Sequence, residues 1–113
     1  IDTLRDALAK RAALEADAGR PLVQGLLADA LLSLGRPEEA LDACERGLDD
    51  AARLGERYWE PELHRRHGEA LALLGQHDAA LTALLRAQEL ATRQGARALL
   101  TRIERDLGAA SRR

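Results

Sequence analysis

The chain has 113 residues, of which 46% are hydrophobic and 32% are charged, and its formal net charge is −2. Length and composition predict one globular domain, and the scarcity of β-branched aliphatic residues, which are limited to Ile1, Val23 and Ile103, excludes a strand-rich fold. Charges of both signs are interspersed, which disfavours direct binding of nucleic acid, and the lone Cys44 excludes a disulfide framework.

No stretch of the sequence is apolar enough to cross a membrane. The longest unbroken apolar run covers residues 70–74, whereas a spanning helix needs roughly 20 apolar residues. The sequence opens on Ile1 without a basic and apolar leader, so we expect a cytoplasmic segment cut from a longer protein, with no membrane partner.

Proline and glycine divide the chain into helices. Pro21 and Pro61 stand where a helix can begin, and Gly35 and Gly75 follow the last apolar turn of the segments that these prolines open. Apolar residues between the breakers recur every three or four positions, which is the helical period. The predicted helices cover residues 2–18, 21–34, 37–54, 58–74, 77–94 and 97–110. The sequence therefore predicts an all-α fold of about six antiparallel helices.

The middle of the chain contains an internal repeat. A shift of 40 residues superposes identical residues at the breaks and along the helices. The pairs include Pro21 with Pro61, Ala30 with Ala70, Leu31 with Leu71, Leu34 with Leu74, Gly35 with Gly75, Ala40 with Ala80, Ala43 with Ala83 and Gly55 with Gly95. A fixed period of this size is typical of a solenoid of stacked helical hairpins. The single domain, 1–113, divides into a half repeat 1–19, repeats 20–56 and 57–95, and a half repeat 96–113.

Small residues recur where the paired helices must approach closely. They are Ala28, Ala40 and Gly47 in the first repeat and Gly68, Ala80 and Ala87 in the second. This arrangement resembles the tetratricopeptide pattern, which implies a superhelix of helical hairpins. The family's usual aromatic positions are Leu31, Leu71, Cys44 and Leu84 here, and the period exceeds the family's period of about 34 residues. A HEAT-like scaffold fits the period better but not the spacing of small residues, so it is the second choice.

One segment carries a sharper resemblance. Residues 55–69 read GERYWEPELHRRHGE. They resemble a segment of the C-terminal tetratricopeptide-like regions of large bacterial signal-transduction ATPases, including LuxR-type transcriptional regulators and adenylate-cyclase-type proteins, and depart from it mainly at Pro61 and His67. The resemblance implies a sensor or scaffold region whose ATPase and DNA-binding or cyclase domains lie outside these residues. The chain itself has no P-loop motif.

The sequence offers little that could support catalysis or hold a cofactor. His64 and His67 share a helical face with Glu60, which could form a partial metal site, but no second ligand pair accompanies them. Cys44 and His77 could pair as nucleophile and base, yet Cys44 occupies an apolar helical position typical of a buried side chain. We therefore predict a protein that is not an enzyme and has no cofactor and no metal.

Tyr58 and Trp59 are the only aromatic residues, and they are adjacent. On an α-helix they would point about 100° apart, so we expect that they do not face one pocket. Trp59 is expected to pack inward as a structural residue, together with Gly68, Ala80 and Ala87, and Tyr58 to stay near the surface.

The first helices of successive hairpins line the concave side of a solenoid, which makes that side the candidate binding surface. If the tetratricopeptide alignment holds, the residues facing it are Leu22, Gly25, Asp29, Ser33, Glu62, Arg65, Glu69 and Leu73. This mixed, rather acidic surface suits a protein or peptide segment with basic and apolar character. A solvated face without a ligand is the plainer interpretation.

Two other interpretations of the function remain. The segment could be architectural and mediate self-association through exposed repeat ends, whose apolar faces stack. A DNA-binding helix-turn-helix is the weaker one, because it predicts salt-sensitive DNA binding from a chain without a basic patch.

Overall fold

The computed structural model describes residues 2–111 of the chain, with side chains described for residues 3–12 and 18–110. Within these residues the fold is all-α, which confirms the predicted class. The helices are α1 (Asp2–Asp17), α2 (Arg20–Ser33), α3 (Pro37–Leu54), α4 (Glu60–Leu73), α5 (His77–Gln94) and α6 (Arg97–Ser111), with a short 3₁₀ helix η1 (Arg57–Trp59) before α4. In the described part of the chain, no helix has the length and apolar character of a membrane span.

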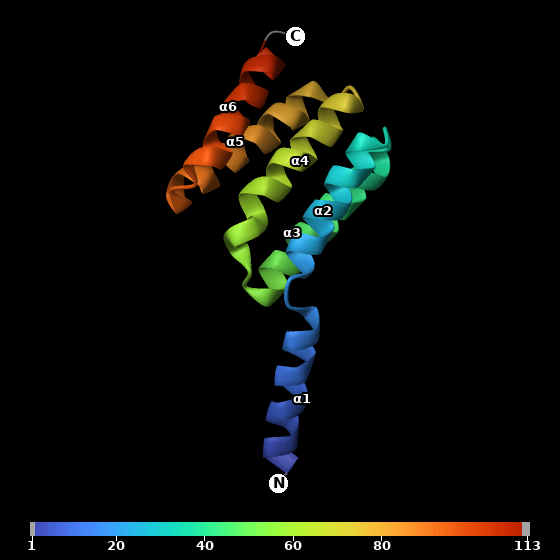
Figure 1. Cartoon of the computed structure of the whole chain (residues 1–113), viewed down its shortest axis with the longest axis vertical. Coiled ribbons are helices and arrows are strands. Elements are labelled where there is room, and N and C mark those ends of the chain that lie inside the picture. The colour runs from blue at the N-terminus through green and yellow to red at the C-terminus, as the bar shows by residue number, and fades with distance from the viewer. Residues whose placement is uncertain (1, 112–113) are drawn as a thin grey trace.

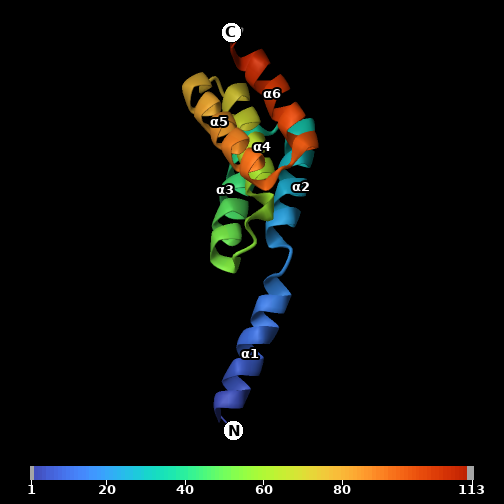
Figure 2. The same cartoon turned by 90° about the vertical axis from the view of Figure 1, so that its left-hand side faces the viewer.

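Helices α2 to α6 form a bundle in which neighbours along the chain pack antiparallel, whereas α1 projects away from it along the long axis (Figure 1). The molecule measures 62 × 30 × 20 Å as a result. Viewed from the side, α3 and α5 lie on one side of α4, and α2 and α6 lie on the other (Figure 2). Helix α4 contacts all four other helices of the bundle and is therefore its central element.

The two central hairpins have matching bounds 40 residues apart, because α2 and α4 begin at Arg20 and Glu60 and α3 and α5 end at Leu54 and Gln94. Left-handed glycines end the helices where the sequence predicts, with φ 72° at Gly35 and 80° at Gly75. The N–H of the residue after each of these glycines donates to the carbonyl five residues back, Arg36 N to Leu31 O and Gln76 N to Leu71 O, both at 2.9 Å. This bonding satisfies carbonyls that a helix end leaves open, so each hairpin turn is specified locally.

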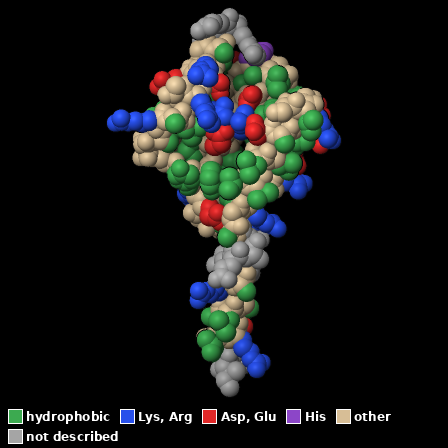
Figure 3. Space-filling model, in the orientation of Figure 1, with side chains coloured by type: hydrophobic (Ala, Val, Ile, Leu, Met, Phe, Trp, Pro, Cys, Tyr) green, Lys and Arg blue, Asp and Glu red, His purple; other side chains and the backbone are tan. Residues whose placement is uncertain are grey.

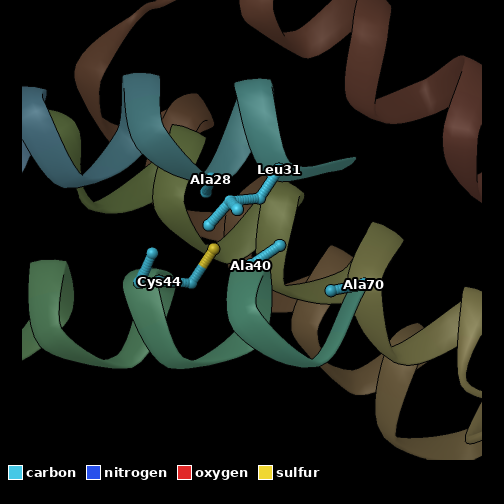
Figure 4. Packing of buried hydrophobic residues seen from close by; sticks show 6 residues of the cluster. Ala28, Leu31, Ala40, Cys44 and Ala70 are labelled. Carbon is cyan, nitrogen blue, oxygen red and sulfur yellow. The ribbon is translucent and has the colours of Figure 1, made fainter. Parts of the chain in front are cut away.

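The core at the first hairpin is built from small side chains. Ala28 and Leu31 of α2 lie against Ala40 and Cys44 of α3, and Ala70 of α4 completes the cluster (Figure 4). Ala28, Ala40, Cys44 and Ala70 have no exposed surface. Helices with such small residues at the contact approach closely, which explains how a chain with only two aromatic residues excludes water from its interior.

Glycine marks two of the closest contacts. A Cβ added to Gly68 of α4 would stand 3.0 Å from Leu84 Cγ and 3.1 Å from the Ala80 carbonyl oxygen of α5. A Cβ on Gly47 of α3 would stand 2.8 Å from Leu63 Cδ2. The small residues singled out in the sequence, namely Ala28, Ala40, Gly47, Gly68, Ala80 and Ala87, are all buried.

The start of α4 departs from the prediction. The expected helix begins at residue 58, but Tyr58 and Trp59 lie in the 3₁₀ turn and α4 begins at Glu60. Pro61 sits in the first turn of α4, where its missing N–H costs no hydrogen bond.

Candidate functional site

An open groove lies between α2, α4 and α6. Its main cavity has a volume of about 300 Å³. The lining residues are Pro21, Leu22, Gly25, Leu26, Asp29, Trp59, Glu62, Leu63, Arg66 and Arg102. Figure 3 shows charged side chains gathered over the middle of this face with hydrophobic side chains directly beside them. The groove thus has an apolar part and a charged part.

Apolar side chains are left accessible at the groove. Leu26 is 61% exposed and Leu22 is 36% exposed, although both lie on α2 within the bundle. Trp59 is half-buried and closes the end of the groove from the η1 turn. Covering these exposed leucines and the half-buried tryptophan with another apolar group would lower the free energy, because it removes apolar surface from water.

Trp59 also lines a second cavity, of about 390 Å³, formed with α6 and the end of α5. Trp59, Glu62 and Arg102 border both cavities, so the two hollows are neighbours. Tyr58 lines the second cavity as well. The prediction that Tyr58 and Trp59 do not face one pocket is therefore wrong, because they lie in a 3₁₀ turn and their rings meet edge to face at 5.0 Å and 89°.

The charged part of the groove is organised by Arg66 of α4. Its guanidinium reaches Asp29 of α2 at 2.8 Å, Glu69 at 2.9 Å and Glu62 at 3.1 Å. Asp29 lies on another helix, so this ion pair ties α2 to α4 across the floor of the groove. Asp29 and Glu69 keep 49% and 41% of their side-chain surface exposed. Both carboxylates therefore remain open to a ligand on their outer sides.

Arg65 links α4 to α6 in a corresponding way. Its guanidinium donates to both oxygens of Glu62, at 2.7 and 3.1 Å, and to Asp106 of α6 at 3.1 Å. Burial works against the charged form, but the hydrogen bonds and charges of Glu62 and then Asp106 outweigh it and raise the Arg65 pKa above its ordinary value. Among the described residues of this network, four carboxylates surround two arginines, so it is net acidic.

The structure brings half of the predicted binding residues into the main cavity and separates the rest. Leu22, Gly25, Asp29 and Glu62 line that cavity. Glu69 and Leu73 line another, of about 240 Å³, between α4, α5 and α6. Ser33 is exposed at the last residue of α2. Arg65 has only 8% of its side chain exposed, and its guanidinium is already engaged by Glu62 and Asp106 rather than offered to a partner.

Several residues at the groove do not appear among the predicted ones. Leu26 and Arg66 stand one position along the chain from the predicted Gly25 and Arg65, an error of register that a period of three or four residues allows. Arg102 and Asp106 come from α6, which the sequence treats as the half repeat 96–113. If α6 is taken as the first helix of a third repeat, its amphipathic pattern includes both residues.

The remaining candidates from the sequence are the pair of Cys44 with His77 and the pair of His64 with His67. Cys44 lies in the apolar cluster, where burial raises its thiol pKa to about 12, while His77 is exposed at the first residue of α5. Burial and the neighbouring His67 lower the pKa of His64. Within the described residues, no group of three or more His, Cys, Asp or Glu side chains is placed to hold a metal ion.

Comparisons of the chain with family models, curated proteins and solved structures gave no match. Its function must therefore be argued from the groove itself.

Proposed function

We propose that this chain is a protein-interaction module that binds a peptide segment or helix of basic and apolar character in the groove between α2, α4 and α6. The observation that carries the proposal is the pairing of exposed Leu22 and Leu26 with the half-exposed carboxylate of Asp29 in one groove, beside a network that is net acidic. A peptide that presents leucine-like side chains to α2 and arginine or lysine to Asp29 would satisfy both parts, and a further basic residue could reach Glu69 on the other side of Arg66.

The same surface argues against an enzymatic role for these residues. The thiol of Cys44 is buried and protonated, so it is no nucleophile. The carboxylates at the groove are paired with Arg65 and Arg66 rather than facing each other in a desolvated pocket. Binding is the chemistry that this arrangement supports best.

We further propose that the module belongs to the tetratricopeptide-like class and forms the sensor or scaffold end of a bacterial signalling or transcriptional regulator. The support is the 40-residue repeat, which matches the bounds of the two hairpins, and the resemblance of residues 55–69 to that class. On this proposal, ATPase and DNA-binding or cyclase domains are expected elsewhere in the parent protein.

Trp59 gives a direct test, because it is the only tryptophan and lies in the groove. The probe is an amphipathic helical peptide with leucine and lysine on one face, and the control peptide has glutamate in place of each lysine. We expect the lysine peptide to shift Trp59 emission saturably, and added salt to weaken it. Equal affinity for the glutamate peptide would overturn the proposed charge complementarity.

A pair of variants tests whether the peptide binds in the groove or nonspecifically to exposed leucines. Leu26→Glu places a charge in the groove, and Leu85→Glu places one at a 49% exposed leucine of α5, outside the residues that line the groove. Since both leucines are largely exposed, neither variant should unfold the protein. The lysine peptide should lose most of its affinity for Leu26→Glu and keep it for Leu85→Glu. Equal losses in the two variants would place the binding elsewhere.

A further inference from the structure

Helix α2 has an apolar face that nothing in the bundle covers. Val23 is 61% exposed, Leu27 is 47% exposed and Leu34 is 69% exposed, and Ala30 between them is exposed too. Their spacing places these four residues along one side of the helix. We call them the open face of α2. The groove is a different side, because it is lined by Leu22, Gly25, Leu26 and Asp29.

The corresponding face of α4 is closed by the helix before it. Forty residues after the open face stand Leu63, His67, Ala70 and Leu74. Leu63 is 1% exposed and packs at Gly47 of α3, and Ala70 is fully buried in the cluster with Cys44 of α3. His67 Nε2 lies 3.6 Å from Oε1 of Glu45, which is also on α3. Thus α3 occupies, on the second hairpin, the position that is vacant on the first.

A cavity next to the open face shows the same difference between the first and the second hairpin. It lies between α2 and α3, has a volume of about 440 Å³, and includes Leu27, Leu31 and Ala43 in its lining. In the second hairpin the residues that match Leu31 and Ala43 are Leu71 and Ala83, and Leu41 of α3 packs against the cluster that contains them. The position forty residues before Leu41 is Ile1, which lies outside the described residues.

Helix α1 has the residues to fill this vacancy. Leu4, Ala7 and Leu8 stand forty residues before Cys44, Gly47 and Leu48 of α3. The bundle does not bury the two leucines, because Leu4 is 64% exposed and Leu8 is 56% exposed.

The junction between α1 and α2 holds α1 away from the open face of its own chain (Figures 1 and 2). In the α5–α6 turn, the Gly95 N–H donates to the Thr92 carbonyl at 3.1 Å, and the Ala96 N–H donates to the Ala91 carbonyl at 3.0 Å. These two bonds close the end of α5 and form the hairpin turn. Gly19 instead caps the start of α2, and its N–H donates to Glu56 Oε1 at 3.0 Å. Gly19 therefore belongs to the start of α2, and the turn differs from the one that closes the α5–α6 hairpin.

We propose that two copies of the chain exchange these helices, so that α1 of each copy packs on the open face of α2 of the other. Exchange related by a two-fold axis uses the same pair of surfaces twice and closes as a dimer. It buries Leu4 and Ala7 against Ala30 and Val23 of the partner copy, as Cys44 and Gly47 are buried against Ala70 and Leu63 within one chain. The proposal does not depend on the groove or on what binds there.

Sedimentation equilibrium of the whole chain tests the exchange. The wild-type protein should sediment at twice the mass of one chain, and Leu4→Glu and Val23→Arg should each weaken the dimer by about 100-fold or more, because each would bury an unpaired charge. Both residues are exposed in a single copy, so helicity by circular dichroism should not change. Leu85→Arg, at an exposed leucine of α5, is the control and should remain dimeric. A wild-type monomer at every concentration, or equal dissociation by Leu85→Arg, overturns the proposal.

Cross-linking identifies which copy supplies α1. A chain carrying both Ala7→Cys and Val23→Cys brings two cysteines together at the contact that matches Gly47 with Leu63, where a Cβ on residue 47 would stand 2.8 Å from Leu63 Cδ2. Cys44 stays out of the reaction because it is buried with a raised thiol pKa. Mild oxidation should yield a covalent dimer. A disulfide formed within one chain would show that α1 folds back onto its own α2 and would overturn the exchange.

Discussion

Replacing Gly68 by alanine tests whether close helix packing, rather than bulk hydrophobic burial, stabilises this bundle. In an exposed helix, glycine to alanine stabilises by about 1 kcal/mol. At Gly68 the new methyl group would stand 3.0 Å from Leu84 Cγ and 3.1 Å from the Ala80 carbonyl oxygen. The backbone oxygen cannot rotate away, so α4 and α5 must separate, at the cost of about 1–3 kcal/mol that overpacking carries. We expect a net loss of about 1 kcal/mol in the free energy of unfolding.

Gly25 is the matched control, because it also lies inside a helix but faces the groove. Its added Cβ would meet only Leu63 Cδ2, at 3.6 Å, which is an ordinary contact. Gly25→Ala should therefore stabilise the protein by up to about 1 kcal/mol. Urea unfolding followed by circular dichroism measures both variants on one scale. If Gly68→Ala proves as stable as Gly25→Ala, the close approach of α4 and α5 is not what limits the size of residue 68.

Three further predictions concern single side chains. Arg65→Met should lower the free energy of unfolding by about 1–3 kcal/mol in urea titrations, because it leaves Glu62 and Asp106 without their shared partner. The control is Arg57→Met, which removes an arginine with a 64% exposed side chain. It should change the free energy of unfolding by less than about 1 kcal/mol. Cys44, buried with a thiol pKa of about 12, should react with a thiol reagent only at the rate of unfolding, and rapid labelling of the native protein would contradict its burial. Burial lowers the His64 pKa below its ordinary 6.5, so the contribution of neutral His64 to stability is fully present above pH 6.5 and is lost as the pH falls below that value. His64→Gln should therefore reduce the dependence of the free energy of unfolding on pH. The measurement is made above about pH 4, where carboxylates do not titrate strongly.

The helix boundaries could be predicted because they are specified by local chemistry. Gly35 and Gly75 are in the left-handed region that glycine adopts most readily, and each closes its helix with the same two backbone bonds. Pro37 opens α3 as expected, with Glu38 and Glu39 in the first turn. Such signals act within a few residues, so one sequence is sufficient to read them.

Contacts between distant residues could not be read in this way. The pairing of Arg65 with Asp106 joins positions 41 residues apart, and it turns a predicted binding residue into a buried link between helices. At the junction between α1 and α2, the Gly19 N–H donates to Glu56, which is 37 residues away. No local pattern distinguishes a helix that folds back from one that extends, because both leave the same amphipathic sequence.

The groove and the open face of α2 share one physical origin. Helix α2 is apolar on more sides than α3 can cover, with Leu22 and Leu26 toward the groove and Val23 and Leu27 on the open face. Residues such as Leu63 and Ala70 in α4 show how the same positions look once a neighbouring helix has covered them. The surplus apolar surface of α2 is thus where both of the proposed interactions begin.

The most direct test of the binding role is a map of amide chemical shifts of the labelled protein titrated with the leucine and lysine peptide. We predict that the largest changes fall on residues that line the groove, above all Leu22, Leu26 and the indole N–H of Trp59, while Leu81 and Leu85 on α5 stay unchanged. Changes centred on α5, or the same changes with the glutamate peptide, would contradict the assignment of this groove as the binding site.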